Sequence, residues 1–167
     1  PKTGKYYEID WREEDLRACI DDDFDGDGLA VAEAYFANVA KVAEKKPTIL
    51  GHFDLIKKIN SGSKFFDEND PRYTAAANAA LMAAARNRCV LEVNTSAAYR
   101  GFRKDYFPSD AILKDWLVLS GNVVLTADVH DVKALTYGFE EAAAKLKELG
   151  YTKVQVLGKD GFIPCAL

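Results

Sequence analysis

The chain has 167 residues, of which 49% are hydrophobic and 29% are charged, and its formal net charge is −4. A chain of this length and composition is expected to fold as one globular domain with a sizeable core, so we treat residues 1–167 as a single domain. The acidic balance argues against nucleic acid as a partner, and the lack of an apolar run of about 18 residues argues against insertion in a membrane.

Apolar periodicity predicts an alternation of helices and short buried strands. In chain order, we expect helices over 11–20 and 29–45, a strand over 48–52, a helix over 70–88, a strand over 89–94, a helix over 108–119, a strand over 122–125, a helix over 137–149 and a strand over 153–157. Asp70 and Pro71 are the expected cap and first-turn proline of the third helix, and Gly150 is the expected stop of the last. Residues 6–9 are a further candidate strand, and the apolar tail at 161–167 is expected to pack on the domain.

An acidic segment at 21–28 has the sequence DDDFDGDG. Its first half fits a calcium loop of the EF-hand type, which carries acids at positions 1, 3 and 5 and glycine at position 6. The glutamate required at position 12 is missing, because Glu33 falls one residue away from that position in both possible registers. We therefore interpret the segment as a solvated acidic loop in which Asp27 caps the next helix, with calcium binding as the alternative.

Cys19, Cys89 and Cys165 are far apart in the sequence, odd in number and in no metal-binding spacing. This pattern is typical of reduced thiols rather than of a disulfide framework. Together with the lack of a signal-peptide pattern, it predicts a cytoplasmic protein.

Polar side chains follow three of the predicted strands where each strand ends. His52 closes the first, Glu92 and Asn94 the second, and Asp128 and His130 the third. Alternating strands and helices predict a parallel sheet, whose carboxyl ends all lie on one side, so these residues should converge. Imidazole and carboxylate together suit zinc, iron or manganese. The sequence therefore predicts a metal site built from both of the chain's histidines.

Five short blocks stand in order along the chain: GHFDL at 51–55, LEVNTS at 91–96, YRG at 99–101, YFPS at 106–109 and TADVH at 126–130. From about residue 29 to the C-terminus, the sequence resembles the PHP (polymerase and histidinol phosphatase) superfamily, specifically its histidinol-phosphate phosphatase branch. The resemblance implies an α/β fold, a distorted TIM barrel of the (β/α)7 PHP type. It also implies a divalent metal centre of zinc, manganese or iron, and hydrolysis of L-histidinol phosphate to histidinol and phosphate in histidine biosynthesis.

The same resemblance assigns roles to individual residues. His52, Asp128 and His130 match metal ligands. Asp128 is also the candidate catalytic residue, which would hold the metal or accept a proton. Glu92 and Asn94 match a supporting pair. Candidate contacts to the substrate phosphate are Arg100, because guanidinium binds phosphate with two parallel hydrogen bonds, and more loosely Lys57 and its neighbour Lys58. Each of these cations has an alternative interpretation as a solvated loop charge.

The sequence also departs from the family. Members open with a His-x-His strand, whereas no histidine precedes His52 here, and a full barrel needs on the order of 200 to 250 residues. We therefore expect a partial barrel that corresponds to the C-terminal portion of the family fold and carries an incomplete metal site. The alternative is a truncated or non-catalytic chain that keeps only the scaffold. The open barrel edge is expected to be covered by a second copy of the chain, as a homo-oligomer, or by the tail.

Overall fold

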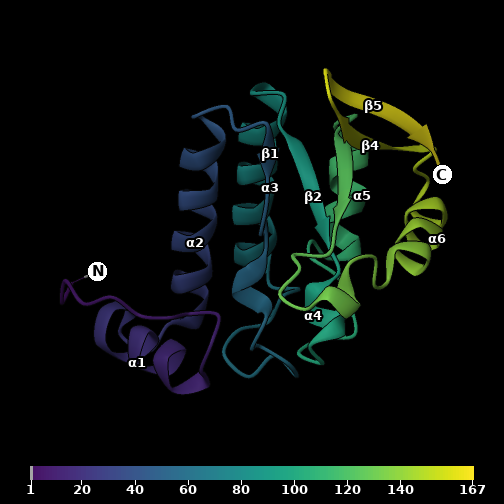
Figure 1. Cartoon of the computed structure of the whole chain (residues 1–167). Coiled ribbons are helices and arrows are strands. Elements are labelled where there is room, and N and C mark those ends of the chain that lie inside the picture. The colour runs from purple at the N-terminus through teal and green to yellow at the C-terminus, as the bar shows by residue number, and fades with distance from the viewer. Residues whose placement is uncertain (1) are drawn as a thin grey trace.

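A computed structural model describes residues 2–167, and Figure 1 shows the path of the chain. The helices are α1 (Glu13–Phe24), α2 (Gly28–Ala43), α3 (Pro71–Arg86), α4 (Ser96–Tyr99), α5 (Asp110–Val118) and α6 (Phe139–Leu149), with short 3-10 turns η1 (Leu55–Lys57) and η2 (Val132–Ala134). The strands are β1 (Ile49–Leu50), β2 (Val90–Asn94), β3 (Asn122–Thr126), β4 (Lys153–Gly158) and β5 (Gly161–Ala166). Within the described residues, no helix is both long and apolar enough to cross a bilayer.

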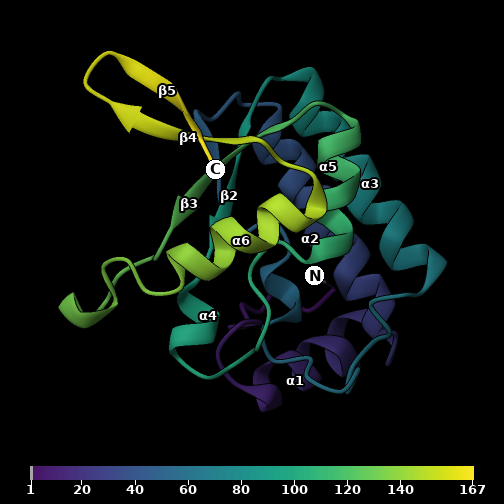
Figure 2. The same ribbon diagram turned by 90° about the vertical axis from the view of Figure 1, so that its right-hand side faces the viewer.

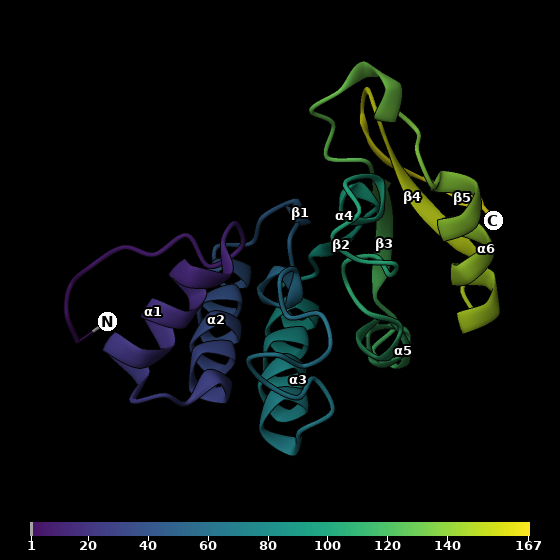
Figure 3. The same ribbon diagram turned by 90° about the horizontal axis from the view of Figure 1, so that it is seen from below.

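The strands form one sheet in the order β1-β2-β3-β4-β5. The first four strands run parallel, and β5 pairs antiparallel with β4. Helices α3, α5 and α6 each connect one parallel strand to the next. Figure 3 shows α2, α3, α5 and α6 following one another along the same side of the sheet. The predicted α/β class with parallel strands is confirmed.

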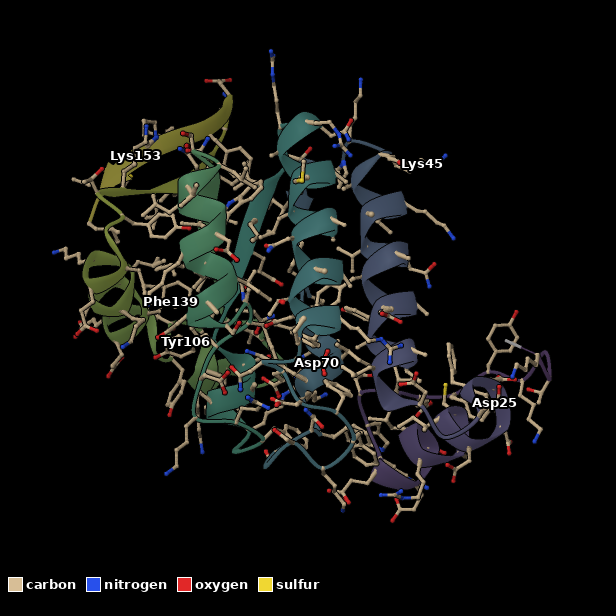
Figure 4. The ribbon with its side chains drawn as sticks, turned by 180° about the vertical axis from the view of Figure 1, so that it is seen from behind. Asp25, Lys45, Asp70, Tyr106, Phe139 and Lys153 are labelled. Carbon is tan, nitrogen blue, oxygen red and sulfur yellow. The ribbon has the colours of Figure 1, made fainter. Side chains whose placement is uncertain are left out.

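The starts of α2 and α3 follow the expected capping chemistry. The Asp27 carboxylate accepts a hydrogen bond from the Ala30 amide at 3.1 Å and caps α2. Asp70, at the start of α3 in Figure 4, accepts from the Arg72 amide at 2.8 Å, and Pro71 occupies the first turn. Each cap satisfies an amide that has no partner within its own helix. Both caps were predicted from the sequence.

The core lies between the sheet and the helices α2, α3, α5 and α6. Leu91 and Val93 of β2 and Val123 of β3 are almost fully buried on the helical side. Trp116 of α5 fills the gap beside them, and its indole donates to the carbonyl of Asn122 at 2.9 Å. A Cβ atom on Gly121 would lie 2.0 Å from the indole ring, so only glycine allows the chain to turn this closely around Trp116.

The N- and C-terminal segments differ from the prediction. Residues 6–9 form no strand, so that expectation was wrong; the fifth strand is β5, formed by the apolar tail. The tail pairs with β4 along Lys153–Gly158 in a hairpin that projects from the sheet (Figure 2) and covers the edge of the parallel strands. β5 follows β4 after a two-residue turn at Lys159 and Asp160, and its strand conformation depends on this pairing rather than on an apolar alternation of its own.

The acidic segment does not form a calcium loop in the described residues. Asp22 and Asp23 lie in the last turns of α1, where Asp22 pairs with Lys5 at 2.9 Å and Asp23 accepts from the Thr3 amide at 2.7 Å. Asp25 lies at the end of α1, away from the sheet (Figure 4), and pairs with Lys2. Because neighbouring carboxylates point to separate partners, they do not converge on one point.

Candidate functional site

A cavity of about 210 Å³ lies at the carboxyl ends of β1, β2 and β3. In Figure 1 these strand ends lie at the lower end of the sheet, where α4 also lies. The cavity is lined by five of the residues expected from sequence: His52 after β1, Lys58 after η1, Arg100 after α4, and Asp128 and His130 after β3. The parallel topology therefore brings together residues separated by up to 78 positions in the chain.

Asp128 lies at the centre of the site. Its Oδ2 atom is 3.4 Å from Nε2 of His52 and 3.4 Å from the Ser96 hydroxyl, and the Asn94 side-chain amide donates to it at 3.5 Å. Partial burial acts to raise the pKa of Asp128, but the Asn94 hydrogen bond and the charges of His52 and His130 outweigh it, so the pKa lies below its ordinary value. Asp128 is consequently ionised at neutral pH, which is the form that binds a cation.

His130 connects the carboxylate to Arg100. The His130 Nδ1 atom lies 2.8 Å from the backbone carbonyl of Asp128 and 3.8 Å from its Oδ1 atom, and the Arg100 guanidinium also contacts Nδ1. With its proton on Nε2, the ring accepts from Arg100; with its proton on Nδ1, it donates to the carbonyl. Arg100 is an exposed side chain and places a permanent positive charge at the cavity.

Glu92 links the three strand ends. One carboxylate oxygen accepts from the backbone amide of His52 at 2.9 Å, and the other accepts from the Thr126 hydroxyl at 2.7 Å. A Cβ atom on Gly51 would lie 2.9 Å from the first oxygen, so glycine at this position permits the close approach. The expected supporting role of Glu92 thus has a concrete form in this arrangement: its carboxylate positions the backbone that carries His52.

Two site residues adopt a backbone conformation that is uncommon outside glycine. His52 has φ of 52° and Asp128 has φ of 44°, both in the left-handed region. Such residues cost free energy and persist where surrounding contacts hold them, often at functional sites. Here the Glu92 bond to the His52 amide and the Asn94 bond to Asp128 supply such contacts.

The donors present fit part of a metal centre. Two ligands about 2.1 Å from a tetrahedral zinc ion lie about 3.4 Å apart, which matches the 3.4 Å between His52 Nε2 and Asp128 Oδ2. The Nδ1 atom of His130 faces Arg100, so this nitrogen does not complete the set. Among residues 2–167, no group of three or more His, Cys, Asp or Glu side chains is arranged to hold a metal ion. The pair fits as two adjacent ligands, and a full centre requires further donors.

The two neighbouring lysines lie in different environments. Lys57, a predicted phosphate contact, is fully buried between Asp54 at 3.1 Å and Asp105 at 2.7 Å, and it does not line this cavity. Lys58 does line it, and its ammonium pairs with Asp10 at 3.2 Å. The 3-10 turn η1 directs the two side chains to different places.

Two polar cavity residues were not predicted from the sequence. Asp10 comes from the segment before α1, in a turn closed by the Trp11 amide bonding to the Glu8 carbonyl. Ser96 begins α4, and its amide donates to the Asn94 side chain at 2.9 Å. Ser96 follows the predicted polar pair on β2 and could have been inferred from that position. Asp10 carries no local signal, since its place depends on how the N-terminal segment folds over the sheet.

Comparison with models of known protein families gives no match, and comparison with curated protein sequences finds no relative.

Proposed function

We propose that this chain is the C-terminal portion of a PHP-type metal-dependent phosphomonoesterase that hydrolyses L-histidinol phosphate to histidinol and phosphate. One observation carries the proposal: His52, Asp128, His130 and Arg100 line a single cavity at the ends of adjacent parallel strands. Metal-ligating side chains and a phosphate-binding cation are the two components that such a reaction requires.

The strand order supports a partial barrel. Consecutive parallel strands lie next to one another, with their connecting helices on the same side, as in an arc of a (β/α) barrel. Glu92, Val124 and Gln155 share the opposite face of the sheet, because they occupy paired positions on β2, β3 and β4. That face corresponds to a barrel interior. The free edge of β1 is where a further strand, from a second copy or from a longer chain, would pair.

Arg100 and Lys58 are suited to bind the phosphate group. Both line the cavity, and the Lys58 side chain is only 8% exposed, so its charge acts in a partly desolvated environment. His52 and Asp128 would hold a divalent metal ion of the zinc, manganese or iron type as adjacent ligands. Such ions neutralise phosphate charge and activate water for attack on phosphorus. Ser96 and Asn94 orient the Asp128 carboxylate by their hydrogen bonds.

The free cysteines agree with a cytoplasmic setting for this reaction. Cys19 and Cys89 are buried and unpaired, and Cys165 is exposed and unpaired. Reduced thiols persist in the cytoplasm, where disulfides are rare.

Release of inorganic phosphate from L-histidinol phosphate tests the function. The purified chain, supplied with Mn²⁺ or Zn²⁺, should release phosphate, and a chelator should abolish the release. Asp128→Asn should lower the rate by a factor of at least about 100, because it removes the charged ligand. Activity that survives chelation or is unchanged in Asp128→Asn would rule out the metallophosphatase.

A second candidate is a non-catalytic chain that retains the scaffold and a partial metal or phosphate site. It is favoured by the incomplete ligand set among the described residues. This candidate predicts metal or phosphate binding at the cavity without phosphate release, so a binding titration beside the activity assay separates the two.

A further inference from the structure

Asp10 places a negative charge in the cavity that is proposed to bind the phosphate group of the substrate. The cavity holds two permanent cations, Lys58 and Arg100, and two carboxylates, Asp10 and Asp128. A phosphate dianion alone is poorly matched to Asp10, because like charges repel in a partly desolvated site. A ligand that carries a positive group beside its phosphate matches both kinds of charge.

The Asp10 carboxylate is available for such a group. Its Oδ2 atom pairs with the Lys58 ammonium at 3.2 Å, whereas its Oδ1 atom makes no hydrogen bond within residues 2–167. The Asp10 side chain is 41% exposed, so a ligand in the cavity can reach its carboxylate.

The Lys58 ammonium has hydrogen-bond donors that are free to bind a ligand. It is held over the Phe102 ring, 4.8 Å from the centroid, and Asp10 is its one hydrogen-bond partner among the described residues. An ammonium has three donors, so two remain for phosphate oxygens. Since Lys58 and Asp10 are in contact, a phosphate on Lys58 and a cation on Asp10 would lie only a few atoms apart.

From these contacts we infer that Asp10 determines specificity by binding the ammonium group of a 2-amino alcohol phosphate, while Lys58 and Arg100 bind its phosphate. The inference rests on the proposed function and adds to it the residue that selects a zwitterionic phosphomonoester over an anionic one.

The test compares two probes that differ only in the ammonium group: O-phosphoethanolamine and ethyl phosphate. Dissociation constants are measured by NMR titration of the full chain. The wild-type chain should bind phosphoethanolamine roughly 10- to 100-fold more tightly, the range expected of a charge-assisted hydrogen bond. Asp10→Asn should abolish that preference, Asp10→Glu should retain most of it, and Asp21→Asn, an exposed acid on α1, should leave it unchanged.

The outcomes separate this inference from the proposed function. If the wild-type chain binds both probes equally, or if Asp10→Asn retains the preference, the role of Asp10 is refuted while the phosphate site stands. If the wild-type chain binds neither probe, the phosphate site and the role of Asp10 both fail. Circular dichroism would show whether the Asp10→Asn variant is unfolded. In that case the role of Asp10 is decided by comparing the preference for phosphoethanolamine in the wild-type and Asp10→Glu chains.

Discussion

At the scale of single residues, the site depends on how Asp128 is held. Its carboxylate accepts a hydrogen bond from the Asn94 side-chain amide and lies beside both histidines of the chain. These contacts keep the pKa below its ordinary value despite partial burial. A carboxylate of this kind stabilises the fold above its unfolded pKa and loses that contribution as the pH falls through the folded pKa.

Removal of the Asn94 amide should raise the pKa of Asp128. In Asn94→Ala the burial effect remains but the strongest opposing contact is gone, so the pKa moves up towards its ordinary value. NMR titration of the Asp128 carboxyl carbon measures the change. Asn78→Ala, an exposed position on α3, serves as the control. A pKa equal in the Asn94→Ala and wild-type chains would contradict the assigned contact.

Gly51 and Glu92 should be energetically coupled. Gly51→Ala puts a Cβ atom 2.9 Å from the Glu92 carboxylate, which must then leave the His52 amide. We expect a loss of about 1–3 kcal/mol in the free energy of unfolding, measured by urea denaturation. In a Glu92→Ala background the same substitution should cost much less. Equal costs in both backgrounds would show that the two residues act independently.

At the scale of elements, helix starts that look alike in sequence differ in their capping hydrogen bonds. Asp70 caps α3 through its side chain, whereas Ser109, at the equivalent position of α5, makes no side-chain cap hydrogen bond. Only the first side chain therefore contributes a bond to an otherwise unpartnered amide. The sequence alone suggested both helix starts, but it did not distinguish their energetics.

Asp70→Ala should lower the free energy of unfolding by about 1 kcal/mol, the usual worth of a side-chain cap. Ser109→Ala should change it much less, because no cap bond is lost. Chemical denaturation of the two variants beside the wild-type chain measures the difference. A larger loss for Ser109→Ala than for Asp70→Ala would contradict the assignment.

At the scale of the whole molecule, a partly buried charge network joins η1 to the loop that follows α4. Lys57 lies between Asp54 and Asp105, and Arg103 connects Asp105 to Glu68 at 3.0 Å. Burial acts to raise the pKa of Asp105, but Arg103 and Lys57 hold it at about 2. The stabilisation from this carboxylate is present at neutral pH and is lost as the pH falls from about 4 towards 2.

Lys57→Met should be strongly destabilising, by about 3–5 kcal/mol at neutral pH, because it leaves the buried Asp54 carboxylate without its cation. Lys145→Met removes a half-exposed lysine that pairs with Asp110 and Glu148, and should change stability little. Urea denaturation of both variants tests the contrast. Similar losses for the two would show that the Lys57 network does not anchor the fold.

The sequence predicted the parts of this molecule that depend on local pattern. Apolar runs indicated four of the strands, and the polar residues at their ends, His52 and Asp128 among them, meet as parallel topology requires. Asp10 was missed because its partner Lys58 is distant in sequence. β5 was missed because the apolar tail was expected only to pack on the domain, whereas it forms the second strand of a hairpin with β4. Lys57 and Lys58 are adjacent in sequence, and only the tertiary fold shows that Lys58 is the one at the cavity.

The most direct test of the proposed metal site is a zinc titration of the chain by calorimetry. The wild-type chain should bind Zn²⁺ at least about tenfold more tightly than Asp128→Asn, which loses the charged ligand beside His52. Asp131→Asn is the matched control, because Asp131 bonds to Tyr99 and does not line the cavity, and it should bind like the wild-type chain. Equal zinc affinity for the wild-type and Asp128→Asn chains would contradict the account.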